Sequence, residues 1–360
     1  MPARVLVVDD SAVVRQALAQ ILGRAGLAVT TANDPIIAMD KMCRERPDAI
    51  VLDLEMPRMD GLTFLRKVMA EDPIPVVVCS GLAGPGSEIA LRALEEGAVD
   101  IVEKPRLAVK DFLEGSAARL VHVVRAAVLA RVHRRPAARH PPPKLQGCSG
   151  FILPARPAAR GPGARVVVVG ASTGGTEALR QLLEAMPPDA PGIAIVQHMP
   201  PVFTAQFAAR LDRSCRIEVK EAAEGDRLHP GRALVAPGDR HLALRRAGEV
   251  YVVDVLTGPP VSLHRPSVNV LFRSAAQAAG GNAAGVILTG MGDDGADGLA
   301  ELRAAGARTL AQDEASCVVF GMPKEAIARG AVEEVLPLSR IAPALLDWWR
   351  SPPSGPWHRP

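Results

Sequence analysis

The sequence lacks the features that mark membrane and secreted proteins. No apolar run approaches the roughly 18 residues that a membrane span requires. The first residues, Met1 to Arg4, lead directly into a strand-like run and carry neither the apolar stretch nor the cleavage site of a signal peptide. We therefore expect a cytoplasmic protein that does not insert into a membrane.

Cysteine is scarce, and charge of one sign is not in excess. The five cysteines are widely scattered and none forms a C-x-x-C pair, so the sequence predicts reduced thiols without a disulfide framework or a zinc site. The net charge of +3, from 42 basic and 39 acidic residues, is too balanced to indicate nucleic-acid binding.

Acidic residues are missing altogether between Glu114 and Glu177, where arginine and proline are frequent. This stretch shows no sustained period and is typical of a stiff, solvated linker. A chain of 360 residues is long enough for two domains with a connector. We predict a first domain over residues 1–125, a linker over 126–163, a second domain over 164–350 and a disordered tail over 351–360.

The first domain alternates short apolar runs with amphipathic stretches. The apolar runs span residues 5–8, 49–52, 76–79 and 99–102, and the amphipathic stretches span residues 11–22, 62–69, 88–95 and 111–129. This βα repetition predicts a parallel sheet with helices on both faces. In such sheets ligands bind at the carboxyl ends of the strands.

Polar residues follow these apolar runs: Asp9 and Asp10 the first, Asp53 the second, Ser80 the third and Lys104 the last. Three carboxylates at one edge of a sheet repel one another unless a divalent cation lies among them, so the pattern predicts a Mg²⁺ site. Next to such an ion Asp53 can accept a phosphoryl group. Ser80 and Lys104 can then bind the phosphoryl oxygens.

The first domain resembles the receiver domain of two-component response regulators. The resemblance rests on residues 7–11 (VVDDS), 52–61 (LDLEMPRMDG) and 103–105 (EKP). It implies that a histidine kinase phosphorylates Asp53, that Asp10, Asp53 and the backbone carbonyl of Glu55 bind Mg²⁺, and that Asp9 lies in the outer shell. The family usually has a switch aromatic at the position of Ile101. We therefore expect the signal to pass through Ser80 and the loop after it.

A glycine-rich turn opens the second domain. A β-branched run at residues 166–169 leads into Gly170-Ala171-Ser172-Thr173-Gly174-Gly175 and then into a helical stretch. A dinucleotide fingerprint would need a glycine in place of Ser172 and an acid about 20 residues later, whereas the next strand ends in Gln197-His198. The alternative is a G-x-S-x-G nucleophile elbow, which exposes the serine hydroxyl at a strand-to-helix turn.

Two further strand ends supply the other parts of a catalytic triad. One apolar run ends at Gln197-His198, and another, at residues 285–288, is followed by Asp293 and Asp294. If the three strands are neighbours, Ser172, His198 and an aspartate meet above one edge of the sheet. His198 could then take the serine proton while the aspartate orients the imidazole.

The second domain resembles the catalytic domain of chemotaxis protein-glutamate methylesterases. The motifs that carry the resemblance are residues 170–175, 197–200 (QHMP), 266–268 (PSV), 289–292 (TGMG), 312–314 (QDE) and 319–323 (VFGMP). The resemblance implies that Ser172 is the nucleophile, His198 the general base and then acid, and Asp294 the orienting carboxylate. The Met291 N–H is the expected oxyanion donor, assisted by Thr173. Asp293 stands where the family often has Asn.

The two resemblances together imply an α/β protein with two doubly wound parallel sheets, a flavodoxin-like receiver and then a Rossmann-like serine hydrolase domain. Apolar runs at residues 242–244 and 251–255 predict an antiparallel hairpin on the second sheet. The implied activity is demethylation of glutamate methyl esters on chemotaxis receptors, with glutamine deamidation by the same triad. Ester hydrolysis needs no cofactor. His229, His241 and His264 lack metal-ligand spacing and receive no role.

Two other functions stay open. A dinucleotide-dependent reductase would use the glycine-rich turn, and cofactor titration would detect it. A non-catalytic output module that binds DNA would use the second domain differently. No helix-turn-helix pattern and no concentrated basic helix supports DNA binding.

Overall fold

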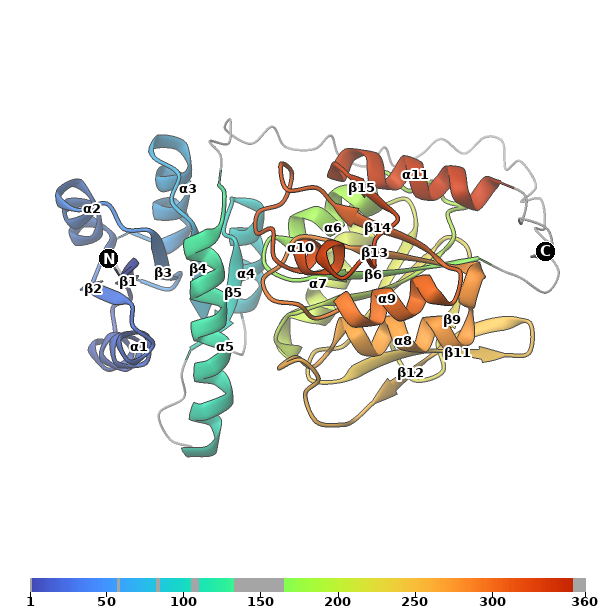
Figure 1. Cartoon of the computed structure of the whole chain (residues 1–360). Helices are drawn as coiled ribbons and strands as arrows, with labels where there is room; N and C mark the ends of the chain where they lie inside the picture. The colour runs from blue at the N-terminus through green and yellow to red at the C-terminus, as the bar shows by residue number, and fades with distance from the viewer. Residues whose placement is uncertain (1, 57–58, 82–84, 105–109, 133–164, 352–360) are drawn as a thin grey trace.

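The computed structural model describes residues 2–56, 59–81, 85–104, 110–132 and 165–351. These residues form an N-terminal unit (residues 2–132) and a C-terminal unit (residues 165–351), each built around its own parallel sheet (Figure 1). The predicted linker and tail lie almost entirely outside the described residues. In the described part of the chain, no helix is long and apolar enough to cross a membrane.

The N-terminal unit has a five-stranded parallel sheet in the order β2-β1-β3-β4-β5. Its strands are β1 (Arg4–Val8), β2 (Ala28–Ala32), β3 (Ala49–Asp53), β4 (Val76–Ser80) and β5 (Asp100–Glu103). Its helices are α1 (Ala12–Arg24), α2 (Pro35–Arg44), α3 (Gly61–Glu71), α4 (Pro85–Glu95) and α5 (Lys110–Leu129). The strand order reverses between β1 and β3, which is where ligands bind in sheets of this type.

The helix starts follow from local chemistry. Ser11 caps α1 by accepting from the Val14 N–H, and Asp34 caps α2 by accepting from the N–H groups of Ile36 and Ile37. The parallel sheet of the sequence prediction is confirmed. Helix α5 continues to Leu129, so the predicted boundary at residue 125 falls inside it.

The C-terminal unit has a seven-stranded parallel sheet in the order β15-β14-β13-β6-β7-β10-β8. Its strands are β6 (Val166–Ala171), β7 (Gly192–Gln197), β8 (Glu218–Glu221), β10 (Arg232–Val235), β13 (Ala283–Ile287), β14 (Arg308–Gln312) and β15 (Glu334–Leu336). Its helices are α6 (Gly175–Glu184), α7 (Pro201–Ser214), α8 (Val268–Ala278), α9 (Ala296–Ala304), α10 (Met322–Ala328) and α11 (Leu338–Arg350), with a 3₁₀ turn, η1 (Gly280–Asn282).

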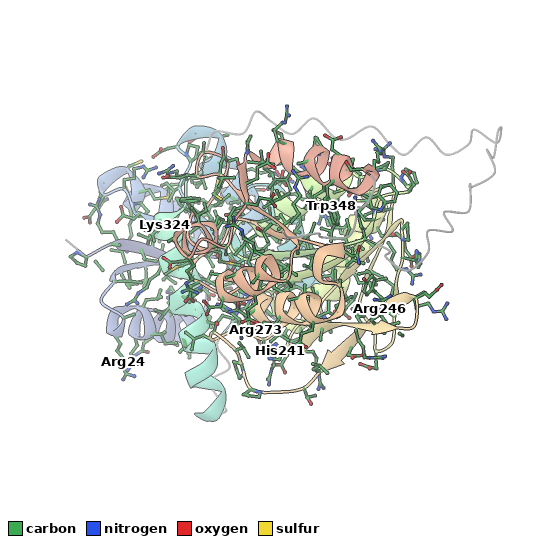
Figure 2. All side chains as sticks on the ribbon, turned by 45° about the vertical axis from the view of Figure 1, so that its right-hand side comes forward. Arg24, His241, Arg246, Arg273, Lys324 and Trp348 are labelled. Atoms are coloured by element: carbon green, nitrogen blue, oxygen red, sulfur yellow. The ribbon has the colours of Figure 1, made fainter. Side chains whose placement is uncertain are left out.

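The centre of this sheet is fully buried, as a parallel sheet covered on both faces requires. Every residue of β6, β7 and β13 is buried. Helix α11 closes one face, where the Arg165 guanidinium lies 4.8 Å from the centre of the Trp348 ring (Figure 2).

The predicted hairpin is present but does not join the main sheet. Strands β11 (His241–Ala247) and β12 (Val250–Leu256) pair in antiparallel fashion, and β12 also pairs with β9 (Arg227–Leu228), so the three form a separate small sheet. Arg246 lies near the hairpin tip and His241 at the other end of β11 (Figure 2). The His241 Nδ1 accepts from the Ser267 N–H over 3.2 Å, so the hairpin supports the start of α8.

The two units meet along α4, β5 and α5. Helix α4 packs against α6 and α7, and Figure 1 shows α4 and α5 between the two sheets. The carbonyl oxygen of Val99 accepts from the Gly174 N–H over 3.0 Å, and the Arg131 N–H donates to Val318 over 2.9 Å. The N-terminal unit therefore contacts the glycine-rich turn that contains Ser172.

Candidate active site

Ser172 lies in a sharp turn between β6 and α6. Its N–H donates to the carbonyl oxygen of Thr289 over 3.0 Å. Gly174 has a φ of +78°, which favours glycine, and a Cβ on Gly170 would lie 2.2 Å from a methyl carbon of Val268. Gly174 is thus required by its backbone conformation and Gly170 by the close Val268 side chain, as a tight nucleophile elbow needs.

His198 and Asp294 lie beside this turn because β13, β6 and β7 are adjacent, as the sequence analysis expected. The His198 Nε2 lies 2.9 Å from the Asp294 Oδ2. The His198 side chain is only 3% exposed and that of Asp294 1%. The structure therefore joins the two side chains that were assigned as base and orienting carboxylate.

The Asp294 carboxylate lies at the N-terminus of α8, which supplies most of its partners. Oδ1 accepts from the Ser267 hydroxyl over 2.7 Å and from the Asn269 N–H over 3.1 Å, and Oδ2 accepts from the Val268 N–H over 2.7 Å. Burial raises the pKa of Asp294, but hydrogen bonds from His198, Ser267 and Val268 outweigh this effect and hold the pKa below its ordinary value. Asp294 is thus an ionised partner for an imidazole.

Asp293 has a different role from its neighbour. Its Oδ2 forms an ion pair with Arg329 over 2.7 Å, and its side chain is 54% exposed. The structure therefore separates the two tandem acids that residue types alone could not distinguish.

Ser172 and His198, the predicted nucleophile and base, directly follow the neighbouring strands β6 and β7, but no hydrogen bond joins their side chains. The His198 Nδ1 is buried and has no hydrogen-bond partner, and Ser172 is 4% exposed. Catalytic hydrogen bonds often form only when substrate is bound. The arrangement therefore holds the imidazole on the Asp294 side and leaves its other nitrogen without a partner.

The two expected oxyanion residues flank Ser172. Met291 follows Gly290, whose Cβ position lies 2.7 Å from the Ser172 Cβ, so the Met291 backbone is close to the nucleophile. Thr173 follows Ser172 directly, but its hydroxyl donates to the Asp100 Oδ2 over 2.7 Å. The Thr173 hydroxyl is therefore engaged by the N-terminal unit.

Asp100 reaches this position from β5. Burial raises the pKa of Asp100, and the hydrogen bond from Thr173 opposes that rise. No sequence pattern pointed to Asp100, because it is one residue within a short strand.

Two histidines that received no role also lie at this interface. The His264 ring stacks on the His198 ring with 3.7 Å between centroids and 6° between planes. His122, on α5, meets His264 edge-on at 5.3 Å. Only the folded chain brings these residues together, since they lie far apart in the sequence and have no motif in common.

The acidic residues of the N-terminal unit gather at the carboxyl edge of its sheet. Asp9, Asp10 and Asp53 each offer a carboxylate oxygen within 4.8 Å of the others. Oxygen ligands at this spacing suit Mg²⁺. Lys104 lies 2.6 Å from the Asp53 Oδ2 and 3.2 Å from the Asp9 Oδ2.

Burial and the contacts of Lys104 with the carboxylates shift the pKa values of this acidic cluster. Burial raises the pKa of Asp53, while the hydrogen bond from Lys104 lowers it. Burial lowers the pKa of Lys104, but the two carboxylates outweigh it and raise the pKa overall. The Glu55 N–H donates to the Asp53 Oδ1 over 3.1 Å, which places the Glu55 backbone beside the cluster.

Ser80 ends β4 and Lys104 directly follows the neighbouring strand β5, and the Lys104 N–H donates to the Ser80 carbonyl oxygen over 2.9 Å. Ile101 is 1% exposed and packs in the core. Most of the loop after Ser80, and the Lys104-Pro105 peptide with its expected cis geometry, lie outside the described residues.

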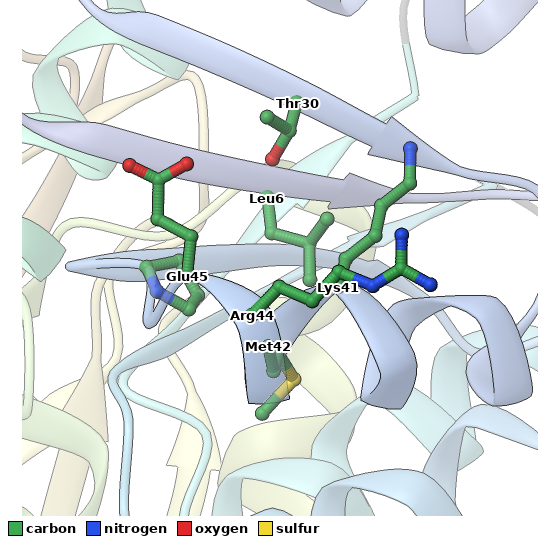
Figure 3. Close-up of a pocket in the computed structure, with 7 residues that line it drawn as sticks. Leu6, Thr30, Lys41, Met42, Arg44 and Glu45 are labelled. Carbon is green, nitrogen blue, oxygen red and sulfur yellow. The ribbon is translucent and has the colours of Figure 1, made fainter.

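A hollow on the N-terminal unit lies away from both sites (Figure 3). It is bordered by β1, β2 and α2 and lined by Leu6, Thr30, Lys41, Met42, Arg44, Glu45 and Pro47. The Lys41 Nζ already donates to the Thr31 carbonyl oxygen over 2.6 Å. The hollow contains none of the predicted site residues.

Each of the two units matches a known protein family. The family model described as CheB methylesterase matches residues 167–345, and that of the response regulator receiver domain matches residues 5–112. A protein-glutamate methylesterase/protein-glutamine glutaminase from Anaeromyxobacter dehalogenans is 71% identical over 350 residues, which cover 97% of this chain and 100% of that protein. The chain belongs to the protein-glutamate methylesterase/protein-glutamine glutaminase family.

Other members of the family match along most of their length. One from Xanthomonas campestris is 57% identical over 344 residues, covering 94% of this chain and 98% of that protein. The crystal structure of the Thermotoga maritima CheB methylesterase catalytic domain matches with a TM-score of 0.50 and 38% identity, covering 51% of this chain and 98% of that one. Family membership favours the hydrolase elbow over a dinucleotide site and over a DNA-binding output module.

Proposed function

We propose that the chain is a phosphorylation-controlled protein-glutamate methylesterase in which Ser172, His198 and Asp294 form the catalytic triad. The observation that carries this proposal is the buried His198–Asp294 hydrogen bond of 2.9 Å beside the Ser172 elbow. We propose the domain division given by the sequence analysis, a receiver over residues 1–125 and a catalytic domain over residues 164–350.

The reaction is acyl transfer in two steps. The Ser172 hydroxyl attacks the ester carbonyl carbon while His198 takes its proton, and Asp294 stabilises the resulting imidazolium. The imidazolium then protonates the departing methoxide, which leaves as methanol. A water molecule attacks the acyl-enzyme, gives its proton to His198 and releases glutamate and the Ser172 hydroxyl. The Met291 N–H, with Thr173 assisting, stabilises the oxyanion of both steps.

The substrates are methylated glutamates of chemotaxis receptors, and a chemotaxis histidine kinase is the phosphodonor. A glutamine side chain fits the same mechanism, because ammonia replaces methanol as the leaving group. Asp53 accepts the phosphoryl group, and Lys104 and Ser80 bind its oxygens. Asp10, Asp53 and the Glu55 carbonyl would hold Mg²⁺ with Asp9 in the outer shell. The ion would neutralise charge on the transferred group.

The receiver inhibits the enzyme by covering the elbow. Val99, directly before β5, and Asp100, its first residue, bond to Gly174 and Thr173, so a receptor segment cannot reach Ser172 until these contacts open. Lys104 follows β5 and pairs with Asp53, so a phosphoryl group on Asp53 would act on the strand that carries Asp100 and begins directly after Val99. We call the arrangement with these contacts closed and the arrangement with the units separated open. A shift of a few kcal/mol in the equilibrium between them suffices to control the enzyme.

The test follows methanol release from membranes that contain a methyl-esterified chemotaxis receptor. We expect the full chain to release methanol slowly, and faster after phosphorylation by a small-molecule phosphodonor with Mg²⁺. The Asp53→Asn variant should stay at the slow rate. Residues 161–360 alone should be fast without phosphodonor. A phosphorylated chain that releases no methanol would refute the esterase, and a fragment no faster than the unphosphorylated chain would refute the inhibitory receiver.

A further inference from the structure

The catalytic imidazole is held by only one hydrogen bond. His198 Nε2 bonds to Asp294, while Nδ1 has no partner. One hydrogen bond fixes the position of Nε2 but leaves the ring able to tilt about the axis of that bond. A second constraint is needed to hold Nδ1 in place, because proton transfer depends on geometry within a fraction of an ångström.

His264 supplies a contact of this kind. Its ring lies parallel to that of His198, with 6° between the planes and 3.7 Å between the centroids. A face-to-face contact opposes tilting of either ring, because tilting would drive atoms of one ring into the other. Burial lowers the pKa of His264, and the nearby His198 lowers it further, so the stacked ring is neutral.

The backbone that presents His264 is unusual. Val261 and His264 exchange two backbone hydrogen bonds, of 3.0 and 2.9 Å, around a two-residue turn. Both turn residues, Ser262 and Leu263, have positive φ values of 50° and 66°. This conformation is typical of Asn-Gly turns and is rare for leucine. Leu263 is 90% exposed, so its own burial does not offset the strain.

The strained turn is tied to the same residue that helps to hold the catalytic aspartate. The Asn269 side chain donates to the Ser262 hydroxyl over 3.2 Å, and the Asn269 N–H donates to the Asp294 Oδ1 over 3.1 Å. Asn269 therefore fixes the turn and the carboxylate relative to each other. Backbone strain that is kept by surrounding bonds is found preferentially at functional sites.

From these contacts we infer that His264 is a positioning residue that holds the plane of the catalytic His198 ring. It does so while remaining neutral, and a neutral ring face next to the imidazolium formed during acyl transfer is also favourable. The inference rests on the proposed function of His198 as base. It differs from the inhibitory role of the receiver, because His264 and His198 both belong to the C-terminal unit.

The test compares His264→Ala with His264→Phe in the phosphorylated full chain with the methyl-esterified receptor membranes. Phenylalanine keeps a planar neutral ring, whereas alanine removes it. We expect His264→Ala to lower kcat by about 10²-fold with KM unchanged within about threefold. His264→Phe should restore kcat to within about threefold of wild type. His229→Ala, at an exposed histidine whose Nδ1 lies 2.9 Å from the Pro230 carbonyl oxygen, is the matched control and should have wild-type kcat.

A second readout does not depend on turnover. The His198 Nε2–H proton, held by Asp294, should give a sharp low-field NMR resonance in wild type and in His264→Phe, and a broadened one in His264→Ala. A sharp resonance and a wild-type kcat in His264→Ala would overturn the inference. A loss confined to KM, or a His264→Phe variant as slow as His264→Ala, would also overturn it. An inactive wild-type chain with the expected NMR pattern would refute the proposed function and support the positioning role.

Discussion

Thr173, the residue after the proposed nucleophile, donates its hydroxyl hydrogen to Asp100 of the receiver over 2.7 Å. The adjacent Gly174 N–H donates to the Val99 carbonyl oxygen of the receiver over 3.0 Å. Two successive residues of the elbow are thus bonded to Val99 and Asp100, at the start of β5. The same contacts that bury Ser172 also occupy a group expected to assist at the oxyanion. In the proposed mechanism, inhibition by the receiver therefore combines steric cover with occupation of the Thr173 hydroxyl.

We predict that Asp100→Ala raises the turnover of the unphosphorylated full chain by about tenfold. The substitution leaves the buried Thr173 hydroxyl without an acceptor in the closed arrangement only, and an unsatisfied buried donor costs about 1–3 kcal/mol. Methanol release measures the effect. Asp40→Ala, at an exposed aspartate on α2 that pairs with Arg44, is the control. An Asp100→Ala chain as slow as the unphosphorylated wild type would argue against this contact as part of the inhibition.

Ser172→Ala should leave the fold intact and remove nearly all esterase activity. The turn around Ser172 is held by backbone bonds and by the flanking glycines, so the hydroxyl can be lost without unfolding. Circular dichroism and methanol release measure the two properties. A folded variant with near wild-type turnover would eliminate Ser172 as the nucleophile.

The tandem acids should differ strongly in their effect on kcat. We expect Asp294→Asn to lower kcat by about 10⁴-fold, the magnitude measured for the corresponding change in the best-studied serine protease triad. Asparagine cannot act as an anionic acceptor for His198, and its NH₂ group would face the N–H donors of α8. Asp293→Asn should have little effect, because Asp293 only pairs with Arg329 at the surface. The reverse result would move the orienting role to Asp293.

The gathering of polar residues at the strand ends was predictable, because a parallel sheet brings the carboxyl ends of its strands to one edge. Apolar runs placed β1, β3, β4 and β5, and the structure brings together three of the carboxylates predicted after these runs, those of Asp9, Asp10 and Asp53. Strand β2 and helix α2 were missed. Strand β2 is AVTTA at the edge of the sheet and mostly half-buried, so its sequence lacks the continuous apolar run of a central strand.

The interface could not be predicted, because its residues share no motif. His264 meets His198 only through a strained turn, and His122 and Asp100 reach the site from the other unit. The position of the hairpin was also not determined by the pattern. The sequence pattern of the two runs predicted that β11 and β12 pair. This pattern does not show which third strand pairs with them.

His122 should make the inhibition sensitive to pH. It lies on α5 with its Nε2 buried and without a hydrogen-bond partner, and it faces His264, His198 and Arg119. Burial lowers the pKa of His122 in the closed arrangement, and its neighbours His198 and Arg119 lower it further. When the units separate, solvent returns the pKa towards its ordinary value of about 6.5.

The direction in which pH shifts the open–closed equilibrium depends on which arrangement binds the proton. As pH falls through about 6.5, the open arrangement takes up a proton at His122 and the closed one does not, so acidification favours opening. Asp100 acts in the opposite direction, because its pKa is raised in the closed arrangement. The ratio of unphosphorylated to phosphorylated turnover reports the open fraction, and it cancels the pH dependence of catalysis itself.

We expect this ratio to rise more steeply on acidification in wild type than in His122→Gln between about pH 8 and about pH 5.5. The contribution of His122 is at most about tenfold per pH unit, the limit for one linked proton. Glutamine keeps a polar side chain without a titrating group, and Asp100 contributes equally to both proteins. Parallel curves for wild type and His122→Gln would exclude His122 as the sensor. If acidification lowers the turnover ratio more in wild type than in His122→Gln, protonated His122 stabilises the closed interface.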